Sequence, residues 1–388
     1  MFTTRFWEQA VRADAPRLQY VKCLDGFRGV GVALVLLEHY SNDRIPIGMP
    51  ALTMFFVMSG YLITTLLIDE HRATGRVDGR DYTERRAIRL LPALWVFLAI
   101  NMIIGLVGFF DLKNITIETV ANLFYLYPVS YLWLHGAKSL VRMPQLWSLS
   151  FVDWFYLIWF FVMRSYLSKP AEKMAKLVRN ITIFMVIQAA LTTLATFALQ
   201  GEGLITIPPL AILYGVSLAY YRRGYLDRAS RDEVSAREDF LLRWSSPVAF
   251  FVTFLFQIFA ATSWRGDFPL KAMSMVSAPF IIGGLVMGKS PWIRWLLERK
   301  PLVWLGQISY AMYLYHFMLF FILENNDPQP GGSPTSLPFW QTYLILFPAT
   351  VLCGWLSQVL VERPAVKWFN RYTKRKKLAA STPSPSTT

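Results

Sequence analysis

An arginine and a histidine share one apolar stretch near the start of the chain. Arg28 and His39 are separated by ten residues, of which only Glu38 is charged. In an α-helix, eleven residues make three turns with a small remainder, so both side chains share a face, about 16 Å apart along the axis. Ionisable residues at membrane depth are costly and tend to mark functional sites. We therefore predict a site here. The alternative is a snorkelling interfacial arginine and an unrelated histidine.

His39 is the residue best suited to proton transfer. Its imidazole is available in the neutral form near pH 7, as a general base requires. Glu38 points about 100° away on the helix, whereas Asp43 follows one turn later and is the better candidate to orient the ring. Asp153 is a third candidate, which could instead cap a helix or pair with an arginine.

Arg86 and Arg89 could bind phosphate. They are three residues apart at the start of an apolar stretch, so they share a helix face. Guanidinium groups bind phosphate with paired hydrogen bonds, and Arg28 is expected at the same membrane depth. The alternative for an isolated pair is a positively charged anchor at the membrane boundary.

Two further sets of residues have both a packing and a functional interpretation. Ser59 and Gly60 could let two helices approach closely or leave room for a ligand. Ser309, Tyr313 and His316 fall on one helix face at spacings of four and three. A lone histidine in such a stretch is more often a packed or interfacial residue than a catalytic one. No metal site is expected, because the sequence lacks the paired His or Cys spacings of known metal sites.

The elements that must position these residues are membrane-spanning helices. The 388 residues are 54% hydrophobic, with a mean hydropathy of +0.36, and stretches near twenty apolar residues can cross a bilayer. We predict an all-α polytopic membrane protein with about ten transmembrane helices. The predicted spans are 25–41, 50–70, 88–110, 147–167, 179–199, 204–221, 246–264, 270–288, 304–324 and 340–361. The stretch 120–134 is short and contains Pro128, so it is expected to be re-entrant or interfacial.

The net charge of +14 reflects topology. With the spans above, most Lys and Arg residues fall on the side that holds both termini, and positively charged loops stay in the cytoplasm. We predict both termini to be cytoplasmic, and we expect no nucleic-acid partner. We divide the chain into an N-terminal cytoplasmic segment (1–22), a membrane domain (23–370) and a basic, disordered tail (371–388).

Together these stretches resemble the bacterial membrane acyltransferase family known as acyltransferase 3, which includes polysaccharide, lipopolysaccharide and macrolide O-acyltransferases. The motifs follow the order of the family over nearly the whole chain. They are Leu24–Gly29 with His39, Phe55–Ile63, Arg85–Pro92, Trp147–Leu149 with Phe155–Leu157, Ser309–His316 and Glu362–Pro364.

The resemblance implies an acyl-CoA donor, with acetyl-CoA as the expected case, and a hydroxyl group on a carbohydrate or glycolipid acceptor. Arg28 and His39 correspond to the Arg-x10-His pair of the family, and Arg86 and Arg89 to its Arg-x-x-Arg element. We assign donor binding to these three arginines with Ser59 and Gly60, and catalysis to His39, Asp43 and Asp153. Acceptor binding or structural support is assigned to Trp147, Ser148, Ser309, Tyr310, Tyr313 and His316.

The resulting hypothesis is an O-acyltransferase of the bacterial inner membrane without a tightly bound cofactor. His39 either removes the hydroxyl proton of the acceptor or takes the acyl group itself. Family members commonly carry two acids after Trp-Ser-Leu, whereas this chain has Val152 before Asp153. Val152 thus keeps a catalytically inactive relative as an alternative. A membrane transporter is a second alternative, because ten spans would allow one.

Overall fold

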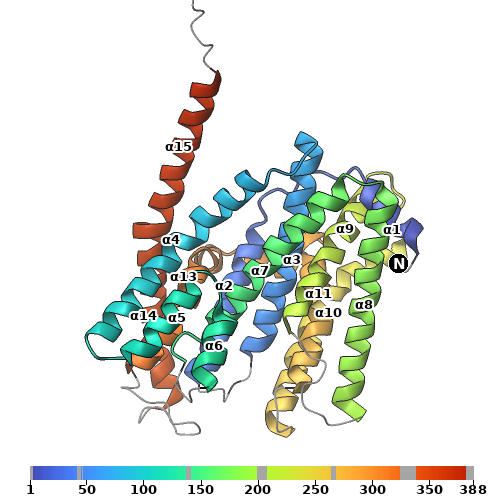
Figure 1. Ribbon diagram of the computed structural model, residues 1–388. Helices are drawn as coiled ribbons and strands as arrows, with labels where there is room; N and C mark the ends of the chain where they lie inside the picture. The colour runs from blue at the N-terminus through green and yellow to red at the C-terminus, as the bar shows by residue number, and fades with distance from the viewer. Residues whose placement is uncertain are drawn as a thin grey trace, which may run out of the picture.

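The apolar stretches of the sequence form long helices that pack side by side (Figure 1). The computed structural model describes residues 3–41, 45, 47–136, 141–198, 208–263, 268–323 and 338–381. The regular elements of those residues are all helices, with no strand, which confirms the all-α prediction. The helices are α1 Thr4–Arg12, α2 Lys22–Tyr40, α3 Gly48–Thr74, α4 Gly79–Leu106, α5 Leu112–Asn122, α6 Tyr127–Gly136, α7 Leu146–Leu167, α8 Ala171–Ala198, η1 Pro208–Ala211, α9 Ile212–Ala229, α10 Ala236–Ser263, α11 Phe268–Val286, α12 Pro291–Leu297, α13 Lys300–Leu323, α14 Phe339–Ser357, η2 Gln358–Glu362 and α15 Arg363–Ser381.

Six helical stretches in the described part of the chain are long and apolar enough to cross a membrane. This number is consistent with the predicted polytopic membrane protein. The other four predicted spans lie on α2, α9, α10 and α11, which are not among these six, so a topology of ten crossings stays a prediction. The six are Gly48–Thr74, Tyr82–Leu106, Leu146–Leu167, Ala171–Leu191, Lys300–Leu323 and Phe339–Lys374.

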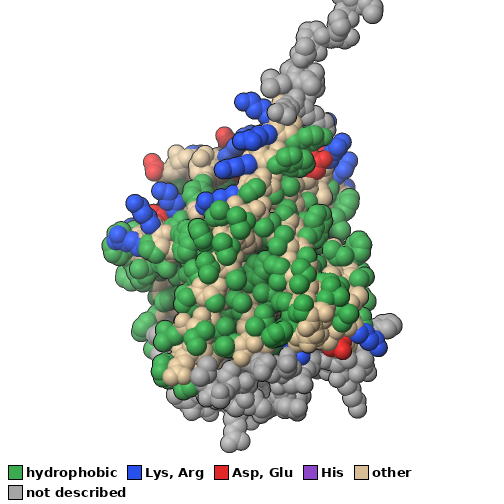
Figure 2. Space-filling model, turned by 90° about the vertical axis from the view of Figure 1, so that its left-hand side faces the viewer, with side chains coloured by type: hydrophobic (Ala, Val, Ile, Leu, Met, Phe, Trp, Pro, Cys, Tyr) green, Lys and Arg blue, Asp and Glu red, His purple; other side chains and the backbone are tan. Residues whose placement is uncertain are grey.

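The outer surface has the composition that a bilayer requires. Figure 2 shows one face, on which hydrophobic side chains cover the middle and most of the visible Lys and Arg side chains gather at one end. Large apolar residues such as Leu106 and Leu360 are about two-thirds exposed. Exposed apolar surface of this extent is compatible with lipid and not with water.

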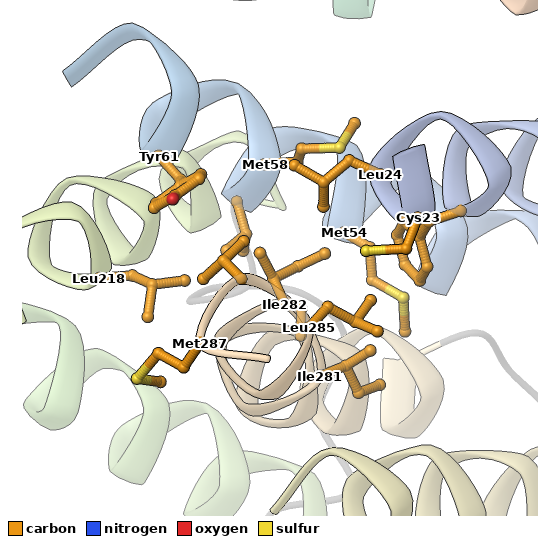
Figure 3. Close-up of a cluster of buried hydrophobic side chains, with 14 of the residues drawn as sticks. Cys23, Leu24, Met54, Met58, Tyr61, Leu218, Ile281, Ile282, Leu285 and Met287 are labelled. Atoms are coloured by element: carbon orange, nitrogen blue, oxygen red, sulfur yellow. The ribbon is translucent and has the colours of Figure 1, made fainter. Parts of the chain in front are cut away.

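Helix α2 connects two hydrophobic cores. Its first half contributes Cys23 and Leu24 to a core that includes α3, α9 and α11, and Figure 3 shows the α11 side chains Ile281 and Leu285 at the centre of that core. The second half of α2 contributes Leu36 and other residues to a core with α4, α7 and α13. Because α2 packs on both sides, the face that carries Arg28 and His39 is held within the bundle.

Glycines bring α2 and α13 into backbone contact. A Cβ atom on Gly306 would lie 1.7 Å from the carbonyl oxygen of Asp25, and one on Gly29 would lie 2.9 Å from the backbone nitrogen of Gly306. His39 follows Gly29 by ten residues, and His316 follows Gly306 by ten residues. The two helices therefore run in the same direction, with equal rises of about 15 Å from the glycine contact to the histidines.

Two predictions about shorter segments have different outcomes. The stretch 120–134 falls on α5 and α6, which have 11 and 10 residues, too few to span a bilayer. The expectation of disorder from Arg371 is wrong up to Ser381, because α15 continues to that residue. Its Lys, Arg, Leu and Ala residues have high helix propensity, which compositional reasoning about the tail overlooked. Residues 382–388 lie outside the described part.

Candidate functional site

Two histidine rings from distant parts of the sequence stack on each other. The ring centroids of His39 on α2 and His316 on α13 are 5.3 Å apart, with an interplanar angle of 26°. The ring of Phe317 lies 4.5 Å from each of them. We call His39 and His316 the histidine pair. The sequence predicted a role for each residue but did not indicate that they meet.

The backbone fixes the orientation of His316. Its side chain is fully buried, and its Nδ1 atom lies 2.7 Å from the carbonyl oxygen of Tyr313. A carbonyl oxygen only accepts hydrogen bonds, so Nδ1 carries the hydrogen. The Tyr40 hydroxyl lies 3.4 Å from the carbonyl oxygen of His316 and 2.6 Å from the Thr350 hydroxyl. These contacts hold α2, α13 and α14 together around the histidine pair.

Ser148 and Trp147 at the start of α7 support the same region. The Ser148 hydroxyl lies 2.9 Å from the Tyr313 hydroxyl, and the Tyr313 ring lies 5.2 Å from that of His316. Trp147 packs against Phe56 of α3, with 6.1 Å between the centroids. Tyr313 thus adjoins His316, and Ser148 holds the Tyr313 hydroxyl.

Arg86 pairs with the predicted acid Asp153. The Arg86 Nε atom donates to Asp153 Oδ1 at 2.8 Å, and the Arg86 Nη2 atom contacts the same oxygen. The guanidinium carbon of Arg86 lies 3.7 Å from the centre of the Tyr156 ring, as in a cation–π contact. The sequence allows Asp153 three roles: orienting His39, capping a helix or pairing with an arginine. The structure shows the ion pair with an arginine. Val152 packs against two hydrophobic cores.

Arg28 and Arg89 face a shared carboxylate. Arg28 lies near Asp25, with 3.8 Å between Nη1 and Oδ1. Glu362 interacts electrostatically with both Arg28 and Arg89. These two arginines are also close enough for their charges to repel each other. The Ser357 hydroxyl donates to Glu362 Oε1 at 3.2 Å. The π-helix η2 therefore places an acid among arginines from α2 and α4.

The three predicted arginines form one group, which we call the arginine group: Arg28, Arg86 and Arg89. Tyr156 connects them, because it lies under Arg86 and is also an electrostatic neighbour of Arg28. The group brings three guanidinium groups together with the acids Asp25, Asp153 and Glu362 beside them, and the Arg89 side chain is exposed. Such an arrangement can bind a polyanion such as a phosphate-bearing donor.

Gly60 has the packing role that the sequence allowed. A Cβ atom there would lie 1.9 Å from the carbonyl oxygen of Ile212, and one on Gly215 would lie 2.0 Å from the carbonyl oxygen of Val57. Helix α9 therefore occupies the space beside Gly60, and the alternative of room for a ligand is wrong. The carbonyl oxygen of Ser59 accepts from the Tyr156 hydroxyl at 3.3 Å, which connects Ser59 to the arginine group.

The remaining predicted residues have structural partners or lie outside the description. Tyr310 donates to the carbonyl oxygen of Leu90 at 3.1 Å, and Ser309 donates to that of Gly306 at 2.8 Å. These bonds stabilise α13 and its contact with α4. Asp43, predicted to orient His39, is outside the described residues.

Sequence reasoning missed three side chains that contact the arginine group or the histidine pair. Glu362 belongs to a quoted motif, so its acidic type at a membrane boundary could have pointed to the arginines. Tyr156 also belongs to a motif, but an aromatic residue in an apolar helix gives no signal of a cation–π contact. Phe317 is one of many phenylalanines, and only the packing of α2 on α13 shows that it contacts both histidines.

The site therefore has two ends joined by one helix. Arg28 marks the end with positive charge, and His39 marks the end with imidazole bases, about 16 Å further along α2. Among the described residues, no group of three His, Cys, Asp or Glu side chains could hold a metal ion. The arrangement can bind an elongated anionic molecule and act on its far end.

Comparisons with known proteins identify the family to which the chain belongs. Residues 21–359 match the family described as an acyltransferase domain. Relatives include "Putative peptidoglycan O-acetyltransferase YrhL" of Bacillus subtilis, 27% identical over 383 residues, which cover 92% of this chain and 57% of the relative. Another is "Peptidoglycan O-acetyltransferase OatA" of Listeria monocytogenes, 25% identical over 373 residues, with coverage of 90% and 56%. The chain thus spans less than two-thirds of the length of these relatives. No solved structure matches.

Proposed function

Because the chain belongs to this acyltransferase family, we propose that it is a membrane O-acyltransferase, transferring an acetyl group from acetyl-CoA to a hydroxyl group of a carbohydrate. The observation that carries the proposal is the geometry of α2, which has Arg28 in the arginine group and His39 in the histidine pair. One rigid helix thus relates the place for phosphates to the place for chemistry.

The arginine group binds the phosphates of the donor. Guanidinium groups form paired hydrogen bonds with phosphate oxygens, and the group draws on two helices. Asp153 acts as a positioning residue, because it holds Arg86 against the Tyr156 ring. With the phosphates at Arg28, the pantetheine arm extends along α2 and places the thioester beside His39.

The reaction takes place beside His39. The oxygen of the acceptor hydroxyl forms a bond with the acyl carbon, the carbon–sulfur bond breaks, and the hydroxyl proton is transferred to a base. His39 acts directly on these groups, since a neutral imidazole can serve as base or as nucleophile. The apolar surface (Figure 2) supports a position in a membrane. The membrane we propose is the bacterial inner membrane, with the arginine group toward the cytoplasmic donor.

The names of the relatives support the class of acceptor. Two of them are named as peptidoglycan O-acetyltransferases, and peptidoglycan offers sugar hydroxyl groups. We extend this to a hydroxyl-bearing cell-surface carbohydrate as the acceptor for this chain. No part of the proposal requires a tightly bound cofactor.

Membrane vesicles test the proposal directly. Vesicles containing the protein receive acetyl-CoA labelled in the acetyl group, and label bound covalently to carbohydrate is measured. The wild type should transfer label, and His39→Ala should lose transfer by at least about 10²-fold, the usual contribution of a general base or more. His71→Ala at the end of α3 is the matched control and should keep transfer.

The same experiment separates transfer from transport. A transporter would move labelled molecules across the vesicle membrane without forming a covalent product. Full transfer by His39→Ala would contradict the assignment of His39 as the reacting residue. Labelled acetyl-CoA that remains unmodified with the wild type would contradict the proposed acetyltransferase activity.

A further inference from the structure

His316 is a second histidine beside the proposed reacting group, and the proposed function leaves it without a role. It lies on α13, 5.3 Å from His39 between ring centroids, and its side chain is fully buried. A buried polar atom without a partner is uncommon and calls for an explanation. The Nε2 atom of His316 is such an atom, since it has no hydrogen-bond partner in the part of the chain that the structure describes.

The hydrogen bonding of His316 is that of a general base. The Tyr313 carbonyl oxygen, 2.7 Å away, fixes the hydrogen on Nδ1, so the neutral ring has its lone pair on Nε2. A histidine oriented by a bond at one nitrogen can accept a proton at the other. His39 differs in that its side chain is only partly buried, and it shares α2 with Arg28 of the arginine group.

The fold maintains the distance between the two rings. The backbone contact of Gly29 with Gly306 fixes α2 against α13, and Phe317 packs on both rings. During transfer the hydroxyl oxygen must lie against the acyl carbon on one ring and within about 3 Å of a nitrogen of the other. The two rings must therefore be direct neighbours, as the 5.3 Å between their centroids makes them.

We infer that the two histidines divide the reaction, with His39 as the acyl carrier and His316 as the base that deprotonates the acceptor. This inference rests on the proposed function. In the first step, a ring nitrogen of His39 forms a bond with the thioester carbon. The carbon–sulfur bond breaks, and coenzyme A leaves as the thiolate with the electron pair.

In the second step, the acceptor hydroxyl oxygen forms a bond with the acyl carbon on His39. The carbon–nitrogen bond breaks and its electron pair returns to His39, while the hydroxyl proton moves to Nε2 of His316. That proton then neutralises the released thiolate through solvent. The sum is acyl-CoA plus alcohol giving ester plus coenzyme A, with no other reactant.

Isotope exchange tests the division without a known acceptor. A protein that forms an acyl-histidine should exchange labelled coenzyme A into unlabelled acetyl-CoA, because the thiolate can reverse the first step. His316→Asn keeps a donor for the Tyr313 carbonyl but lacks a base at the Nε2 position. It should keep exchange within about threefold, while acetyl transfer to vesicle carbohydrate falls about 10²- to 10⁴-fold. His39→Ala should lose both activities, and His71→Asn is the matched control that should keep both.

The outcomes distinguish a failure of the proposed acetyltransferase function from a failure of the roles inferred for His39 and His316. Transfer by the wild type without exchange would overturn the acyl-histidine and leave the proposed function intact. Acetyl transfer retained by His316→Asn would overturn the role of His316 as the base. Loss of coenzyme A exchange in a folded His316→Asn protein would overturn the division of roles between the two histidines. If the wild type neither exchanges coenzyme A nor transfers acetyl from acetyl-CoA, the proposed function itself fails. Retained exchange in His316→Asn also shows that this variant is folded.

Discussion

Asp153 illustrates how a single acid can serve a site without touching the reacting atoms. Its carboxylate pairs with Arg86, and the same guanidinium lies over Tyr156. An arginine held from two sides presents its remaining N–H groups in a defined direction, and such preorganisation strengthens ligand binding. Asp153 is therefore expected to act on donor binding and not on proton transfer.

Replacing Asp153 should weaken donor binding selectively. The Asp153→Asn variant should raise the KM for acetyl-CoA about tenfold, an effect of roughly 1.4 kcal/mol, because Arg86 is no longer held in place. The kcat should change little, because the histidine pair is unaffected. Steady-state kinetics in vesicles measures both constants. Glu84→Gln, which removes an acid bound to the exposed Arg80, is the control, and a fall in kcat alone for Asp153→Asn would contradict the role.

Glu118 is a buried acid outside the membrane-spanning segments. Its two carboxylate oxygens accept the backbone N–H groups of Arg142 and Met143, each at 2.7 Å, which connects α5 to the chain that enters α7. Burial raises the pKa of Glu118 to about 7, because desolvation disfavours the carboxylate more than these bonds favour it.

This raised pKa predicts a pH dependence of stability. Below a pH of about 4.5 the carboxyl is protonated in both states; between about 4.5 and 7 the folded protein binds the extra proton. Folding therefore becomes less favourable as pH rises through this window. Thermal unfolding in detergent from about pH 5 to about pH 8 should show wild type losing stability relative to Glu118→Gln. Parallel curves for the two proteins would contradict the prediction.

At the scale of elements, the contact of α2 with α13 controls the distance between the histidines. The two helices run in the same direction and approach at glycines, and each has its histidine ten residues later. Close helix approach through small residues is a usual way of packing in membranes. Any side chain at these glycines must push the helices apart and separate the rings.

Gly306→Ala tests this arrangement. The new methyl group would lie 1.7 Å from the Asp25 carbonyl oxygen, so a backbone shift is unavoidable. We expect a destabilisation of about 1–3 kcal/mol in thermal unfolding, together with loss of acetyl transfer. Gly105→Ala on α4 is the matched control, because its nearest neighbour, Ile115, would be at an ordinary 3.5 Å. Equal stability of the two variants would contradict the close contact.

The elements that could be predicted from the sequence are those governed by local periodicity. Arg28 and His39 lie on one continuous helix, α2, as their spacing predicts. Contacts between helices were out of reach, because a single sequence does not state which helices are neighbours. The stacking of His39 on His316 and the contact of Gly60 with α9 both belong to that class. The helix that carries Arg28 and His39 was therefore predictable, whereas the neighbours of these side chains on other helices were not.

At the scale of the whole molecule, the distribution of Lys and Arg predicts which segments lie on each side of the membrane. On the face shown in Figure 2, most of the Lys and Arg side chains lie at one end of the band of hydrophobic side chains, and positively charged segments stay in the cytoplasm. The connection between α9 and α10 is then cytoplasmic, and α5 is exterior. Each of these segments offers an exposed site for labelling, at Glu233 and at Lys113.

Cysteine labelling can decide the orientation. Cys23 and Cys353 are the native cysteines, and both are replaced by serine before Glu233→Cys or Lys113→Cys is introduced. A membrane-impermeant maleimide should label Lys113→Cys in intact spheroplasts and Glu233→Cys only after permeabilisation. This result would place the arginine group, near the start of α2, on the side where acyl-CoA is made. The reverse pattern would put the phosphate-binding end outside the cell, where no acyl-CoA is available, and would contradict the proposed donor.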